Sequence, residues 1–197
     1  MPISVPKISF LTKEGQKTKR LDFRYELHKR RLLFLCQDLN SEVVNQITSL
    51  LLFLHLEDED KQQHLFIHSR GGLATHAMAI YDTMQLVTLG VHTIGMGVVA
   101  SMATLLLAGG AYTKRNAYAH ATIMLHHSDC PPYFEGTEAG ISVDFKERFR
   151  VFDMIAEILE ERTGHSYEDL QKVTTAKEAQ DYGIIDAIVD KAREMKL

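Results

Sequence analysis

The sequence is poor in cysteine and proline and has no tryptophan. Its 197 residues include two cysteines and four prolines, while 45% of the side chains are hydrophobic. Two cysteines do not make a disulfide framework, and Cys36 and Cys130 are too far apart in the sequence for a metal-ligand spacing. The apolar fraction excludes a disordered or collagen-like chain. We therefore expect a globular protein with a hydrophobic core, in a reducing compartment.

A large charge of one sign is also missing. The chain has 22 Lys and Arg against 26 Asp and Glu, so no global positive field exists to hold a nucleic acid. Residues 83–113 carry no formal charge, which is longer than the roughly 20 residues that span a bilayer. Five of the twelve glycines interrupt this stretch, however, and predict a buried strand, a turn and a buried helix. We expect neither a nucleic acid nor a membrane as a partner.

Residues 1–30 are basic and show no clear periodicity, which predicts a flexible basic N-terminal arm. Beyond them, apolar strands alternate with amphipathic helices, and glycines mark most of the turns. Strands are expected at 32–35, 65–67, 91–96, 123–125 and 184–188. Helices are expected after an N-cap at Asn40-Ser41, around 80–87, up to 107, over about 145–163, and after a capping box at Thr175 and Glu178. This order predicts one α/β domain over 31–197, with a parallel sheet of repeated βαβ units.

Two strand-to-helix junctions are candidates for chemistry, Gly71-Gly72 and residues 97–102. A serine at such a turn presents its hydroxyl outward, while nearby backbone N–H groups stabilise the oxygen of an attacked carbonyl. Ser101 therefore fits a nucleophile. The alternative is that Ser101 is only a small residue that opens a helix in a tight core.

A serine needs a base, and His126 follows the next strand and is expected at the same edge of the sheet. His127 is expected to point to the opposite side, and His126 itself could be an ordinary polar residue at a strand end. His64 and His68 share a face of one strand, but no further ligand accompanies them, so no metal site is expected.

Taken together, six ordered blocks resemble the proteolytic subunits of the Clp protease, ClpP, over nearly the whole chain. They are residues 30–35, 45–58, 69–85, 97–115, 124–126 and 178–186. The opening residues 1–7 are most similar to the plastid-encoded members of this family in plants.

The resemblance implies a ClpP/crotonase-like fold in which the long helix protrudes as a handle for ring stacking. It implies a serine endopeptidase with Ser101 as nucleophile, His126 as general base, and the N–H groups of Gly71 and Met102 as oxyanion hole. The expected assembly is a tetradecamer of two stacked heptameric rings of Clp proteolytic subunits. An ATP-driven Clp chaperone ring would feed unfolded polypeptides into its chamber, where they are cut to short peptides. No metal or other cofactor is expected in this chain, because the chaperone uses the ATP. The expected location is the chloroplast stroma.

Three departures from the family pattern bear on activity. Val173 stands where the family has the third triad residue, an Asp, and part of the surrounding block is missing; Asp169 is the candidate to replace that acid. Arg70 replaces a proline beside the oxyanion hole. Pro131-Pro132 lies in the strand that pairs with substrate, and proline cannot donate to a strand ladder. A catalytically weak or inactive structural subunit of a mixed ring is therefore the alternative. A hydratase or isomerase of the crotonase type would not explain the pair Ser101 and His126.

Overall fold

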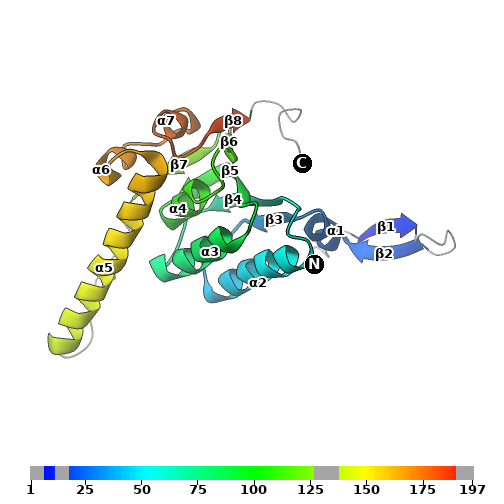
Figure 1. The fold of residues 1–197 in the computed structure, drawn as a ribbon, viewed down its shortest axis with the longest axis horizontal. Coiled ribbons are helices and arrows are strands. Elements are labelled where there is room, and N and C mark those ends of the chain that lie inside the picture. Colours follow the sequence, from blue (N-terminus) through cyan, green and yellow to red (C-terminus); the bar gives the residue numbers. More distant parts are fainter. Residues whose placement is uncertain (1–6, 12–17, 127–137, 190–197) are drawn as a thin grey trace, which may run out of the picture.

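A computed structural model describes residues 7–11, 18–126 and 138–189 (Figure 1). The strands are β1 (Lys7–Leu11), β2 (Thr18–Asp22), β3 (Leu32–Leu35), β4 (Gln63–Ser69), β5 (Val91–Ala100), β6 (Arg115–Tyr118), β7 (Thr122–Met124) and β8 (Ala187–Val189). The helices are α1 (Phe23–Lys29), α2 (Ser41–Glu57), α3 (Ala74–Leu86), α4 (Met102–Ala108), α5 (Glu138–Thr163), α6 (Tyr167–Leu170) and α7 (Ala176–Asp181).

A parallel sheet forms the centre of the fold. Its strand order is β3-β4-β5-β6-β8, and β7 pairs with the far half of β5. All pairings within this sheet are parallel. The mixed α/β class and the parallel sheet predicted from the sequence are confirmed. The register between β4 and β5 shifts between Ile67 and Ser69, next to the first candidate junction.

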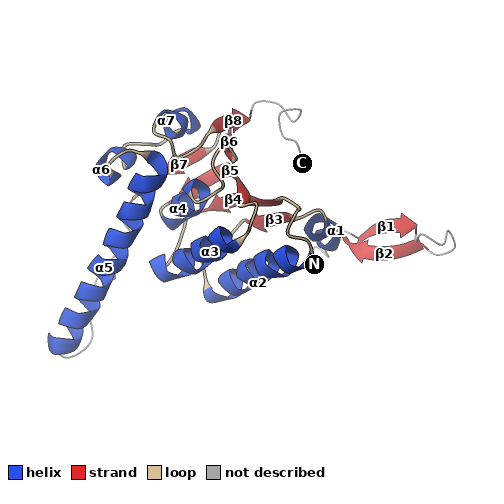
Figure 2. Ribbon diagram, in the orientation of Figure 1, coloured by secondary structure: helices blue, strands red, loops and turns tan. Residues whose placement is uncertain are grey.

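The hydrophobic core lies between the sheet and the helices that cover one of its faces (Figure 2). Fully buried side chains meet there from both layers, among them Leu33, Leu65, Leu51, Ile80 and Leu106. The second helix of this layer, α3, follows the Gly71-Gly72 turn directly, and α4 follows Ser101. The layer therefore fixes both candidate junctions at the same edge of the sheet.

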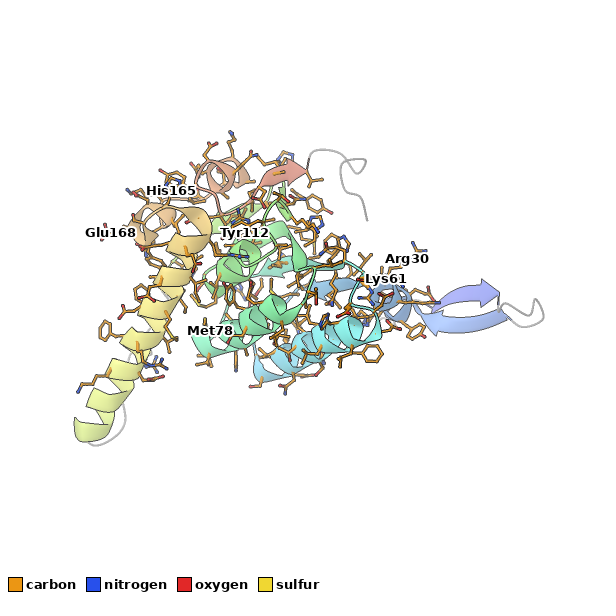
Figure 3. All side chains as sticks on the ribbon, viewed as in Figure 1. Arg30, Lys61, Met78, Tyr112, His165 and Glu168 are labelled. Atoms are coloured by element: carbon orange, nitrogen blue, oxygen red, sulfur yellow. The ribbon has the colours of Figure 1, made fainter. Side chains whose placement is uncertain are left out.

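Helix α5 projects away from the rest of the fold (Figure 3). Residues 146–150 in its projecting part are exposed, including Phe149 at 63%. Ile155 and Leu159, nearer its end, are buried in the core. Gly164 follows the helix with φ +77°, as the predicted stop after Thr163 requires. The expected protruding helix is present.

The predicted caps are confirmed. Asn40 caps α2, where its side chain accepts a hydrogen bond from the Val43 N–H at 3.0 Å. Thr175 and Glu178 form a reciprocal capping box on α7. Among the described residues, no helix combines the length and the apolar character needed to cross a bilayer.

The N-terminal segment differs from the prediction. Where a flexible arm is expected over 1–30, β1 and β2 pair as an antiparallel hairpin and α1 leads into β3. The alternating pattern Ile8-Ser9-Phe10 suits a strand, but the density of lysine and arginine hides it. The boundary of the domain at residue 31 stays a prediction. Toward the other end, β6 was not expected, and the last strand begins at Ala187 instead of Ile184.

Candidate active site

Ser101 occupies a strained backbone position between β5 and α4. Its φ is +53° and its ψ −124°, a region that costs a residue with a side chain about 1–3 kcal/mol. Hydrogen bonds hold it there: the Ser101 N–H donates to the Met124 carbonyl at 2.9 Å, and the Ser101 carbonyl accepts from the Thr104 N–H at 3.0 Å. The Thr104 hydroxyl also donates to the Met124 carbonyl, at 2.9 Å. A sharp turn of this kind is typical of a serine presented for reaction.

Gly71 lies directly against this turn. Its φ is +98°, which favours glycine. A Cβ atom at this position would lie 2.8 Å from the Ala100 oxygen, 2.9 Å from the Met102 nitrogen and 3.0 Å from the Ser101 Cβ. The two junctions predicted from the sequence therefore meet in space, and only a residue without a side chain permits the approach.

The N–H of Met102 comes from the first residue of α4 and has no acceptor within the helix. Met102 is buried, as is the rest of this helix. The structure thus brings the Gly71 turn against the backbone nitrogen of Met102 and the Cβ of Ser101. A pair of backbone donors beside a serine is the arrangement that stabilises the oxyanion of acyl transfer.

His126 lies two residues beyond the end of β7 and is exposed. Its chain is tied to the serine turn, because Ser101 and Met124 share a backbone hydrogen bond. Within the described residues, the imidazole makes no hydrogen bond. Catalytic hydrogen bonds are often long in unliganded enzymes and tighten when substrate binds. His127, Cys130 and Pro131-Pro132 lie outside the described residues.

The described residues give His126 no acidic partner. Asp169 accepts hydrogen bonds from the Lys172 Nζ at 2.7 Å and the Ser166 hydroxyl at 2.9 Å, which hold its pKa below the usual value. Its observed contacts are therefore local to α6. Val173 is fully buried in the core.

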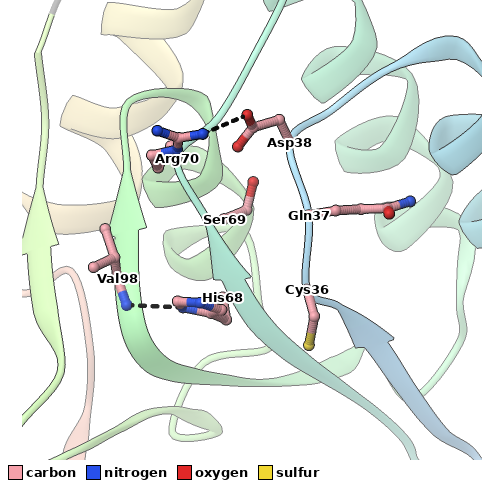
Figure 4. A pocket seen from close by; sticks show the side chains of 7 residues that line it. All are labelled: Cys36, Gln37, Asp38, His68, Ser69, Arg70 and Val98. Carbon is pink, nitrogen blue, oxygen red and sulfur yellow. Dashed lines mark hydrogen bonds and ion pairs between the residues drawn. The ribbon is translucent and has the colours of Figure 1, made fainter. Parts of the chain in front are cut away.

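Arg70 faces solvent with 80% of its side chain exposed, where it pairs with Asp38 at 3.2 Å. The charge that the sequence places beside the candidate oxyanion hole is thus neutralised by a carboxylate at the surface. The same two residues border an open cavity of about 340 Å³ at the ends of β3 and β4. Figure 4 shows its lining, which is Cys36, Gln37, Asp38, His68, Ser69, Arg70 and Val98.

One contact in the site was missed by the sequence reasoning. The Gly71 N–H donates to the Ser69 hydroxyl oxygen at 3.1 Å, and Ser69 is buried. A serine two residues before a glycine in a turn is a recognised pattern for such a bond and could have indicated it. Ser69 therefore belongs to the immediate surroundings of the candidate oxyanion hole.

Comparison with known proteins supports a peptidase. The sequence model described as Clp protease matches residues 14–192. Proteins named ATP-dependent Clp protease proteolytic subunit from Atropa belladonna and Illicium oligandrum are each 39% identical over 194 residues. These alignments cover 95% of this chain and 98% and 96% of the two relatives. A protein of the same name from Epifagus virginiana is 39% identical over 195 residues, covering 95% of this chain and 98% of that relative.

These relatives are plastid-encoded proteins of plants, which indicates a plastid location for this chain. Their names are those of proteases, which favours the peptidase hypothesis over the hydratase or isomerase alternative. The family match spans nearly the whole chain, including both junctions and His126. The chain therefore belongs to the Clp protease family and is a serine-type endopeptidase of that family.

Proposed function

We propose that this chain cuts peptide bonds through Ser101 and His126. The Ser101 oxygen attacks the peptide carbonyl carbon while the His126 imidazole takes the hydroxyl proton. The carbonyl oxygen becomes an oxyanion, and the N–H groups of Gly71 and Met102 stabilise it. The carbon–nitrogen bond then breaks, and the imidazole gives its proton to the leaving amine. A water molecule releases the acyl group from Ser101 by the same steps.

One observation carries this proposal. Ser101 is held at φ +53° by its hydrogen bond to Met124, with Gly71 packed against its Cβ. A small residue that merely opens a core helix does not need this strained position, since helix N-caps ordinarily adopt extended backbone angles. The strain is better explained by a hydroxyl that must be presented to a substrate.

The family also suggests the assembly. Membership of the Clp protease family implies ring oligomers that work with Clp ATPases. We propose seven-membered rings stacked as a tetradecamer, with unfolded polypeptides as substrates and the chloroplast stroma as location. In this arrangement the chaperone ring binds ATP, and this chain needs no metal or other cofactor. The projecting α5 is the element best placed for contact between rings, because its far part exposes Phe149.

The test is covalent labelling of the assembled protein with a fluorophosphonate, which reacts with activated serines. We expect labelling of wild type at Ser101 and none in Ser101→Ala. Ser49→Ala is the matched control, because Ser49 is an exposed serine on α2 far along the sequence from either junction. The control should label like wild type.

Absence of labelling at Ser101 in assembled rings would overturn the proposal. The chain would then contribute its fold and its interfaces to a ring in which other subunits cut. Labelling that persists in Ser101→Ala would place the nucleophile elsewhere and would equally contradict the assignment.

A further inference from the structure

The N–H that is proposed to stabilise the oxyanion is already occupied in this structure. The Gly71 N–H donates to the Ser69 hydroxyl at 3.1 Å, and Ser69 is only 3% exposed. On its other side, the Gly71 carbonyl accepts a hydrogen bond from the Leu39 N–H at 2.8 Å. The turn is thus held from both sides, with its donor directed at an internal acceptor.

An N–H group makes one well-aligned hydrogen bond, and alignment matters steeply for its strength. While Ser69 holds the Gly71 N–H, a substrate carbonyl at Ser101 finds a full donor only in Met102. The oxyanion of the tetrahedral intermediate differs from that carbonyl, because hydrogen bonds to a charged acceptor are roughly twice as strong as neutral ones. The intermediate can therefore take over an N–H that the neutral carbonyl leaves with the serine.

The released Ser69 hydroxyl lies next to an open cavity. Ser69 also lines the open cavity of about 340 Å³ next to Cys36 and Val98 (Figure 4). Rotation of the short side chain about its one torsion can turn the hydroxyl toward this space, where water satisfies it. No backbone movement of the Gly71 turn is required for the exchange.

We propose that Ser69 is a reversible block on the oxyanion hole. Its hydroxyl holds the Gly71 N–H in the unliganded enzyme and gives it up to the tetrahedral intermediate. Ser69 is a positioning residue and takes no part in bond making. This inference rests on the proposed function, because it needs Ser101 to form the intermediate.

The test compares Ser69→Ala with wild type in assembled protein. Loss of one neutral hydrogen bond in the free enzyme, typically worth about 1 kcal/mol, predicts that kcat/KM for a small peptide ester rises about fivefold. KM should not rise, because the freed Gly71 N–H is open to the substrate carbonyl as well as to the oxyanion. The rate of fluorophosphonate labelling at Ser101 should rise by a similar factor, since its phosphonyl oxygen also needs the N–H. Ser69→Thr keeps the hydroxyl and should return the rate to that of wild type.

A rate that falls or stays the same in Ser69→Ala would overturn the block and show a serine that only shapes the turn. If Ser69→Ala does not fold, Ser69→Cys takes its place, because a thiol is similar in size and a weaker acceptor; a rate at or below wild type again overturns the proposal. Failure of the proposed function looks different. Wild type would then show neither turnover nor labelling at Ser101, and the block would fall with it.

Discussion

Arg115 at the start of β6 and Asp186 just before β8 form a two-point ion pair, with Nη2 to Oδ1 at 2.7 Å and Nε to Oδ2 at 3.0 Å. Only 6% of the Arg115 side chain is exposed, and its Nη1 donates to the carbonyls of Arg162 and Gly183 at 3.0 and 2.9 Å. One guanidinium thereby ties the end of α5 and the last strand to the sheet.

Asp186→Asn should destabilise the protein strongly. The change leaves the Arg115 guanidinium buried without a counter-charge, and loss of one partner of a buried pair costs about 3–5 kcal/mol in the free energy of unfolding. Urea unfolding measures it. Asp181→Asn is the control, because it removes an exposed pair with Lys177 and should change little. Equal effects of the two substitutions would contradict the role given to the buried pair.

Gly71→Ala should abolish most of the activity. The added Cβ would stand 2.9 Å from the Met102 nitrogen, so the turn must shift and the Gly71 N–H leaves its place. Removal of one oxyanion-hole donor lowers kcat by about 10²–10³. Steady-state hydrolysis of a peptide ester measures this.

Gly164→Ala is the control for Gly71→Ala, because it separates the steric clash of an added Cβ from the conformational cost of a side chain at positive φ. Gly164 also has a positive φ, +77°, but no atom lies within 4 Å of its added Cβ. This variant should lose some stability and keep its kcat. If both glycine variants lose activity to the same extent, the loss does not come from the oxyanion hole.

The sequence predicts this fold where local signals and burial agree. Strand β3 at 32–35, the Asn40 cap and the Thr175 capping box are found as expected, because apolar runs and capping side chains act locally. Strand β6 was missed because a buried arginine opens it, and only the distant Asp186 makes that burial tolerable. The bond from Gly71 to Ser69 depends on a side-chain rotamer and was not expected.

Acid should weaken the fold through a pair of histidines. His64 on β4 and His92 on β5 are register partners whose ring centres lie 5.0 Å apart. Burial lowers the pKa of both imidazoles, and the positive charge of Lys114 lowers it further. The pKa of His92 falls to about 4, because burial, His64 and Lys114 all act in the same direction. The unfolded chain takes up these protons near pH 6.5, so between pH 6.5 and 4 it binds more protons than the folded protein. The free energy of unfolding should therefore fall as the pH drops through this window.

Thermal unfolding at pH 7.5 and pH 5.0 checks the histidine pair. In His92→Gln the drop in the unfolding temperature between the two pH values should be smaller than in wild type, because one of the two depressed groups is gone. Asp186 titrates at lower pH, since the hydrogen bonds from Arg115 outweigh the effect of burial and lower its pKa. An unchanged drop in His92→Gln would assign the acid sensitivity to other groups.

The segment before α7 pairs with β7 but does not continue as a strand toward His126. Thr122 and Thr175 form an antiparallel bridge, and the Ile123 N–H donates to the Thr174 carbonyl at 3.3 Å. Residues 171–173 form a turn instead, in which the Lys172 and Val173 N–H groups donate to the Asp169 and Leu170 carbonyls at 3.1 and 3.2 Å. The pairing therefore stops short of His126, and the alignment with the family leaves Val173 as the position of the missing acid.

Val173→Asp tests whether an acid at the position given by the sequence alignment can restore a triad. Val173 is fully buried, and an unpaired carboxylate there should destabilise the fold instead of raising the rate of Ser101 labelling. Urea unfolding and fluorophosphonate labelling measure these two effects. A stable Val173→Asp variant that labels faster than wild type would show that this buried position can present an acid to His126.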